Sequence, residues 1–215
     1  MRAPVEAASL PAAAGPPSIQ SLLSRPPSRQ VALIQSTGSS QTVNQRVDAV
    51  FVLSVKSFHD RIRHIESELG RHGIAFEWIF EHDADELTPA QVDAVFAPSD
   101  MKRGHQSLVL KHIETWKRCV ERGYRRVLVF EDDAVLARDF ERVFALAMDE
   151  ADRVDRPYMV YLGCGDNKYV AGARNSPTML LAPGIELPAT DATVLDRRAA
   201  ELRLAYVAAR KVTRP

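Results

Sequence analysis

Three consecutive carboxylates, Glu131, Asp132 and Asp133, are the residues of this chain best suited to chemistry. They follow an apolar run at residues 127–130, which predicts a strand buried on both faces, as in a parallel sheet. Ligands of open α/β sheets bind at the carboxyl ends of such strands. Adjacent carboxylates repel one another unless a cation offsets them, so the triplet predicts a divalent metal that also holds phosphate oxygens. The alternative interpretation is an acidic turn that caps the next helix.

The composition predicts one globular domain with a sizeable core: 46% of the 215 residues are hydrophobic, 26% are charged, and the formal net charge is +0. Zero net charge gives no general attraction to nucleic acid or to an anionic membrane. The two cysteines, Cys119 and Cys164, have neither disulfide-framework nor zinc spacing and favour a reducing compartment. No apolar stretch approaches the ~20 residues of a membrane span. We therefore expect a cytoplasmic protein, with peripheral attachment to the inner membrane left open.

Residues 1–46 differ from the rest because they contain six of the 13 prolines, many alanines and serines, and a single acid, Glu6. Such a segment cannot bury enough apolar surface to order itself, so we expect a disordered extension. The remaining residues, 47–215, are expected to form the domain. Apolar runs predict strands at 50–55, 75–80, 127–130, 158–162 and 178–182. Helical periodicity and capping residues predict helices starting at 60, 88, 106, 139 and 196. The alternation predicts an α/β fold with a mostly parallel sheet.

The chain resembles glycosyltransferase family 25, the lipopolysaccharide-type oligosaccharide transferases. Four blocks carry the resemblance and cover most of residues 50–200. The first block is the strand expected at 50–55 with residues 60–65, and the second is residues 76–79 running into Asp83-Ala84. The third is the helix of His112 and Trp116 leading to residues 127–133. The fourth is Leu162-Gly163 with residues 192–195 and 197–200. The family also carries a Glu-Asp-Asp after a similar apolar strand.

The resemblance implies a nucleotide-sugar-binding fold of the A type, with flanking helices and a divalent metal, Mn²⁺ or Mg²⁺. The donor would be a nucleotide sugar such as UDP-galactose, and the acceptor an oligosaccharide or lipid-linked glycan of lipopolysaccharide or another surface polymer. A metal would stabilise the negative charge of the leaving diphosphate. Family members are expected to invert the anomeric centre, which requires a carboxylate base for the acceptor hydroxyl.

Site residues follow from this resemblance and from position. Glu131 and Asp133 are the expected metal ligands, because residues two apart point to one side of an extended chain, and Asp132 would face the donor ribose or a cap. Arg61 and Asp166 are expected to bind the donor, and Asp191 is the candidate base. Each has a plain structural alternative: a solvated helix residue for Arg61, and turn residues for Asp166 and Asp191. His112 and Trp116 read as core, and Trp78 as core or a sugar-stacking surface.

Two departures from the family pattern keep other functions open. Lys111-His112 stands where the family often has Ser-His, and the chain stops at Pro215, where the family typically continues. A missing C-terminal part would leave a truncated, non-catalytic remnant that binds a nucleotide or a partner. A third hypothesis is another metal-dependent phosphate enzyme, although no Gly-Lys-Ser/Thr phosphate loop is present.

Overall fold

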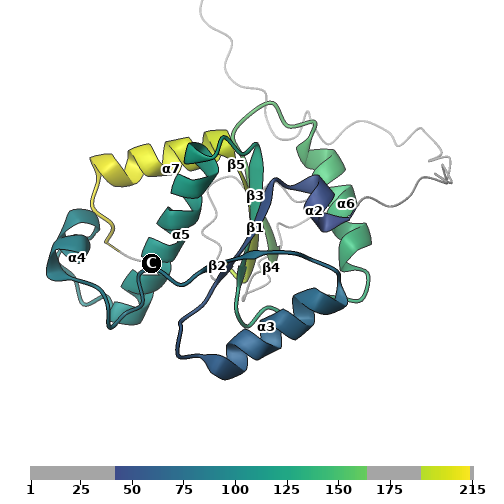
Figure 1. Ribbon diagram of the computed structural model, residues 1–215. Helices are drawn as coiled ribbons and strands as arrows, with labels where there is room; N and C mark the ends of the chain where they lie inside the picture. The colour runs from purple at the N-terminus through teal and green to yellow at the C-terminus, as the bar shows by residue number, and fades with distance from the viewer. Residues whose placement is uncertain (1–41, 164–189, 214–215) are drawn as a thin grey trace, which may run out of the picture. The chain divides into compact units, whose positions relative to one another are not determined.

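A mixed β-sheet forms the centre of the computed structural model, which describes residues 42–163 and 190–213 (Figure 1). Its five strands are β1 (Ala49–Leu53), β2 (Glu77–Ile79), β3 (Arg126–Glu131), β4 (Met159–Gly163) and β5 (Ala192–Asp196). Their order across the sheet is β2-β1-β3-β5-β4. β1 pairs in parallel with β2 and β3, whereas β5 pairs antiparallel with β3 and β4. Four of these strands therefore share one direction, and β5 runs against them.

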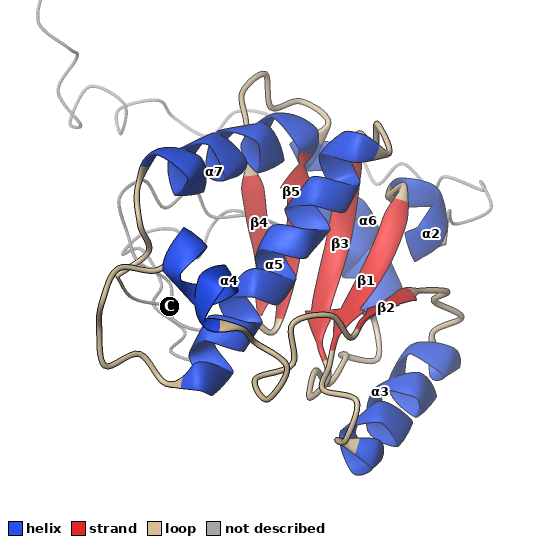
Figure 2. Ribbon diagram, turned by 60° about the vertical axis from the view of Figure 1, so that its left-hand side comes forward, coloured by secondary structure: helices blue, strands red, loops and turns tan. Residues whose placement is uncertain are grey.

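Helices cover both faces of this sheet. They are α2 (Val43–Arg46), α3 (His59–Arg71), α4 (Pro89–Val95), α5 (Arg103–Glu121), α6 (Phe140–Ala151) and α7 (Arg197–Ala209). Alternate residues of β1 enter two cores: Val50 and Val52 pack with residues of α3 and α6, whereas Phe51 and Leu53 pack with residues of α5 and α7. Figure 2 shows α5 and α7 on the near side of the sheet and α6 on the far side. Both faces of the central strands are thus buried, which explains their unbroken apolar sequence.

The predicted α/β alternation is confirmed for these residues, but the direction of one strand was not foreseen. The sheet is mixed because β5 is antiparallel to both of its neighbours. An apolar run buried on both faces has the same sequence whichever way it points, so the pattern of residues 192–196 carries no information on direction. The strand predicted at 178–182 lies outside the described residues.

The boundary expected between residues 46 and 47 stays a prediction. The described structure already contains the short helix α2 before that point, and its Val43 belongs to the same core as Val50 and Val52. The Asn44 side chain also bonds the backbone of Ala75, donating to its carbonyl at 2.7 Å and accepting from its N–H at 3.0 Å.

Several helix ends follow the local sequence signals. Thr88 caps α4 by accepting from the backbone N–H of Gln91, and Pro89 takes the first helical position. Asp196 caps α7 by accepting from Ala199 N–H. Asp60, expected to cap α3, instead lies in its first turn, because the helix begins one residue earlier, at His59. No helix in the described part of the chain is long and apolar enough to cross a membrane.

Candidate active site

The carboxyl edge of the sheet collects the loops that hold the candidate site. β1, β2 and β3 are parallel, so all three end at this edge, with Leu53 paired to Ile79 on one side and to Glu131 on the other. β5 runs the opposite way and therefore begins there. Its preceding residue, Asp191, accepts a backbone hydrogen bond at 2.9 Å from the N–H of Glu131. The antiparallel direction of β5 is the reason that Asp191 reaches the acidic triplet.

Asp132 is the buried centre of the triplet, with 4% of its surface exposed. Ser54, the residue after β1, donates its hydroxyl to Oδ2 of Asp132 at 2.6 Å. Arg61 of α3 donates from Nη1 to Oδ1 of Asp132 at 2.7 Å and from Nη2 to Asp133 Oδ2 at 2.5 Å. The guanidinium thus bridges two carboxylates. The buried Asp132 holds Arg61 in place, and the guanidinium remains partly exposed to solvent.

The orientation expected for the triplet was wrong. An extended chain would point Glu131 and Asp133 to one side and Asp132 to the other. In the structure β3 ends at Glu131 and the next two residues form a turn. Asp132 and Asp133 consequently both bind Arg61. The alternation of side chains between the two faces of a strand holds only as far as Glu131, because the strand ends there.

Glu131 is held separately, at the junction of β3, β5 and α5. Thr190 donates its hydroxyl to Glu131 Oε1 at 2.5 Å. Burial raises the pKa of the Glu131 carboxyl above its ordinary value. The hydrogen bond from Thr190 opposes that shift, whereas the neighbouring carboxylates of Asp133, Asp191 and Asp132 add to it. A further positive charge at this place would favour the ionised form of Glu131.

His112 is buried, as expected, but it makes a polar contact at the site. Its Nε2 lies 3.1 Å from Thr190 Oγ1 and 4.0 Å from Glu131 Oε1. Because the Thr190 hydroxyl gives its hydrogen to Glu131, it accepts from His112, which places a proton on Nε2. Burial lowers the pKa of His112 to about 4, and the positive charge of Arg203 adds to this effect. His112 is therefore neutral at physiological pH and positions Thr190 through a hydrogen bond.

Two further residues, Asp191 and Asp166, were predicted to lie at the site. The Asp191 side chain lies beside the end of β4, where its Oδ2 is 3.7 Å from the position that a Cβ on Gly163 would take. A Cβ at position 163 would therefore make only an ordinary van der Waals contact with this carboxylate. Asp166 lies outside the described residues.

The oxygen ligands suit a divalent cation in chemistry, although they are not arranged as a complete metal site. Among residues 42–163 and 190–213, no three His, Cys, Asp or Glu side chains are grouped to hold a metal ion. Glu131 and Asp133 nevertheless offer carboxylate oxygens, the ligand type that Mg²⁺ and Mn²⁺ prefer. Burial makes ionisation of Glu131 costly, and the negative charge of Asp133 adds to that cost, so the pKa of Glu131 is raised. A cation between them would remove that cost.

The loop after β2 contains site residues that sequence reasoning missed. Lys111, buried on α5, donates to the carbonyl of Glu81 at 2.8 Å and to Asp83 Oδ1 at 2.7 Å. Asp83 Oδ2 in turn accepts from the backbone N–H of Lys56, in the loop after β1, at 3.0 Å. A lysine within the buried stripe of an amphipathic helix was the available signal, because such a charge requires a partner.

The chain is similar in sequence to a known protein family. The family model of glycosyltransferase family 25, described as an LPS biosynthesis protein family, matches residues 47–177, more than half of the 215 residues. The chain belongs to glycosyltransferase family 25. The match covers the strands β1 to β4 and includes Arg61 and the whole acidic triplet.

Individual family 25 relatives are distant. The lacto-N-neotetraose biosynthesis glycosyltransferase LgtE of Neisseria meningitidis is 32% identical over 103 residues, 44% of this chain and 35% of that protein. LgtB of the same organism is 28% identical over 103 residues, 44% of this chain and 36% of that protein. Human procollagen galactosyltransferase 2 is 22% identical over 157 residues, 67% of this chain and 25% of that protein. The matched parts thus span 25% to 36% of these relatives' lengths.

Proposed function

We propose that this chain is a metal-dependent hexosyltransferase that moves galactose from UDP-galactose to a lipopolysaccharide or other surface glycan acceptor. Membership of family 25 supports glycosyl transfer. The names of the relatives support the sugar, since one is a procollagen galactosyltransferase and two act in lacto-N-neotetraose biosynthesis. The observation that carries the proposal is the meeting of Arg61, Glu131, Asp133 and Asp191 at one edge of the sheet.

Arg61 is the proposed donor-phosphate ligand. Its guanidinium is anchored by the buried Asp132, which is itself held by Ser54. A guanidinium fixed in this way presents its remaining N–H groups in a set direction, which suits the oxygens of a diphosphate. Asp166, proposed as a further donor ligand, follows β4 in the sequence.

Glu131 and Asp133 are the proposed ligands of Mn²⁺ or Mg²⁺, which when bound supplies positive charge for the leaving diphosphate. Thr190 orients Glu131, and His112 orients Thr190. Asp191 is the proposed base: its carboxylate accepts the proton of the acceptor hydroxyl as that oxygen attacks the anomeric carbon. Attack from the face opposite the diphosphate inverts the anomeric centre. A cytoplasmic location, or attachment at the inner membrane, fits a lipid-linked acceptor.

Calorimetric titration of the full chain with UDP-galactose tests the donor assignment. Binding is expected with Mn²⁺ and is expected to disappear with a chelator. If UDP-galactose bound equally with and without Mn²⁺, Glu131 and Asp133 would be excluded as ligands of a cation that holds the donor. Release of UDP is then measured with and without a galactose-terminated or glucose-terminated glycan. Release that depends on the glycan supports transfer, whereas equal release without it indicates a hydrolase.

A further inference from the structure

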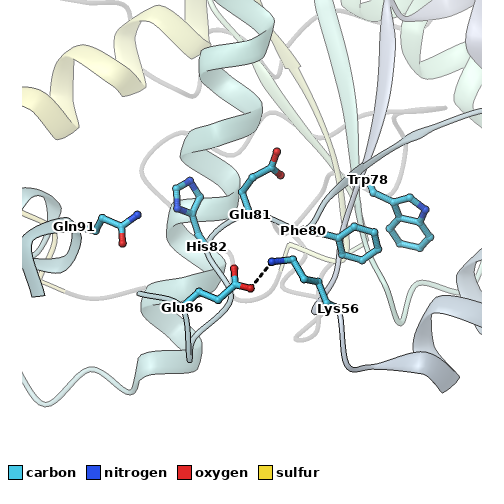
Figure 3. Close-up of a pocket in the computed structure, with 7 residues that line it drawn as sticks. All are labelled: Lys56, Trp78, Phe80, Glu81, His82, Glu86 and Gln91. Carbon is cyan, nitrogen blue, oxygen red and sulfur yellow. Dashed lines mark hydrogen bonds and ion pairs between the residues drawn. The ribbon is translucent and has the colours of Figure 1, made fainter. Parts of the chain in front are cut away.

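A hollow of about 500 Å³ opens at the carboxyl ends of β1 and β2, beside the candidate active site (Figure 3). Its wall combines two aromatic rings with polar side chains from the loops after β1 and β2 and from α4. The lining residues are Lys56, Trp78, Phe80, Glu81, His82, Glu86 and Gln91.

The aromatic part of the wall is a stack built by strand geometry. Trp78 in β2 and Phe80 just after it are two residues apart, so their side chains leave the chain on the same side. Their rings stack with centroids 4.8 Å apart and an angle of 19° between planes. Phe76 supports Trp78 edge-on at 5.0 Å, and both pack against the core. A supported aromatic surface that is open to solvent suits a flat ring, and stacking of one nucleic-acid base on such a surface contributes ~1–3 kcal/mol.

The rest of the wall is polar. Lys56 and Glu86 form an ion pair across the hollow, drawn as a dashed line in Figure 3. Gln91 comes from α4, and its Oε1 already accepts from the backbone N–H of Thr88 at 2.8 Å. Its NH₂ group is therefore the part of the amide left to donate to a ligand.

Buried charges hold this loop in shape. Lys111 ties the carbonyl of Glu81 and the carboxylate of Asp83 to α5, with only 2% of each charged residue's surface exposed. Between them His82 takes a positive φ of 69°, and its carbonyl accepts from the Ser107 hydroxyl at 2.6 Å. A non-glycine residue in this conformation is uncommon and requires support from its surroundings. The hollow is thus preorganised by α5.

The hollow adjoins the proposed phosphate ligand. Lys56 lines it, and the next residue, Ser57, lines a second hollow that contains Arg61. Consecutive Cα atoms are ~3.8 Å apart, so neighbouring residues of the loop after β1 line the two hollows. A nucleoside diphosphate whose phosphates contact Arg61 can therefore extend its base toward Trp78 and Phe80.

We propose that Trp78 and Phe80 form the surface on which the base of the donor nucleotide stacks, and that the Lys111–Asp83 pair positions this surface. The inference rests on the proposed function, because it takes a nucleoside diphosphate as the ligand. It assigns the aromatic surface to the donor and leaves the acceptor glycan to the side of Asp191.

Tryptophan fluorescence tests the stacking directly, because the chain has two tryptophans and Trp116→Phe leaves Trp78 alone. Titration with UDP and Mn²⁺, and with uridine at higher concentration, is expected to quench this fluorescence. Lactose is expected to leave it unchanged. Calorimetry on protein with both tryptophans provides a second measurement: Phe80→Ala should weaken UDP binding about tenfold, and Phe80→Tyr should retain it.

Tyr206→Ala is the matched control, because Tyr206 is an exposed aromatic residue of α7 that lines neither hollow. Its effect on UDP binding should be smaller than that of Phe80→Ala. Quenching by lactose and not by UDP would overturn the proposal in favour of an acceptor site. Metal-dependent UDP binding that leaves Trp78 fluorescence and the Phe80→Ala affinity unchanged would overturn it while the proposed function stands. No UDP binding by the folded wild-type chain would overturn both.

Discussion

Lys111 Nζ lies 2.7 Å from Asp83 Oδ1, in a pair whose side chains are only 3% and 4% exposed. Burying two charges is costly, and each member of the pair makes a further hydrogen bond that offsets part of the cost. The ammonium group also binds the Glu81 carbonyl, and the carboxylate also binds the Lys56 N–H. One ion pair therefore joins α5 to the loops that follow β1 and β2.

Lys111→Met is expected to destabilise the protein by about 3–5 kcal/mol, because it leaves the Asp83 carboxylate buried without its partner. Urea unfolding followed by circular dichroism measures this. Lys117→Met is the matched control, since Lys117 is an exposed lysine of the same helix. Adding Asp83→Asn to Lys111→Met removes the stranded charge and keeps an oxygen for Lys56 N–H, so the double variant should recover part of the loss. Equal stability of the two single lysine variants would contradict this account.

Arg61→Lys is expected to weaken UDP binding by about tenfold or more, because one ammonium group cannot bridge two carboxylates and still bind phosphate. Arg63→Lys supplies the comparison: Arg63 lies on the same helix, is 68% exposed, and pairs with Asp60. It should leave the affinity unchanged in the same calorimetric titration. Similar losses in both variants would indicate a general electrostatic effect and argue against a specific role for Arg61.

Asp133→Ala is expected to abolish metal-dependent binding of UDP-galactose without unfolding the protein, because Asp133 is exposed and its side chain is not part of the core. The melting temperature should stay within a few degrees of the wild type, as usual for exposed positions. Asp93→Ala, at an exposed position of α4, controls for the loss of one negative charge. Unchanged binding that still requires manganese would remove Asp133 from the metal site.

His112 is expected to make stability depend on pH. Its folded-state pKa of about 4 lies below its ordinary value of 6.5. The unfolded chain therefore binds more protons between these values, and the free energy of unfolding falls as the pH drops from 6.5 to 4. The full contribution, up to about 3 kcal/mol, is present above pH 6.5.

Urea unfolding of metal-free protein across this range, compared with His112→Gln, checks the pH dependence. The glutamine variant should lose stability less steeply with acid. His59→Gln, an exposed histidine variant, should follow the wild type. If His112→Gln and wild type show parallel curves, folding does not lower the pKa of His112, and its assignment as a neutral side chain is wrong.

Local patterns predicted most elements of the fold but not the direction of β5. The apolar runs around residues 50 and 128 correspond to β1 and β3, because burial on both faces leaves a clear mark in sequence. Thr88-Pro89 and Asp196 marked helix starts, since their side chains or ring act on the adjacent backbone. The direction of β5 depends on pairing with β3, and no local signal records it.

The sequence indicated which charged residues meet at the candidate site better than it indicated how their side chains are oriented. The triplet and Arg61 were expected, and the structure joins Arg61 to Asp132 and Asp133. The turn after Glu131 overrode the expected alternation. Ser54 and Thr190 were missed, because a single hydroxyl has no pattern of its own and acquires a role only when folding brings a carboxylate to it.

The length of β5 is constrained from both of its ends. Four residues, 192–195, separate Asp191, at the site, from Asp196, which ends the strand, caps α7 and accepts from Tyr158 N–H. Deleting one residue between them would move side chains of the strand from one core to the other and pull either the carboxylate or the cap out of place. Natural selection should therefore remove insertions and deletions within residues 191–196 more strongly than those at the exposed end of α7.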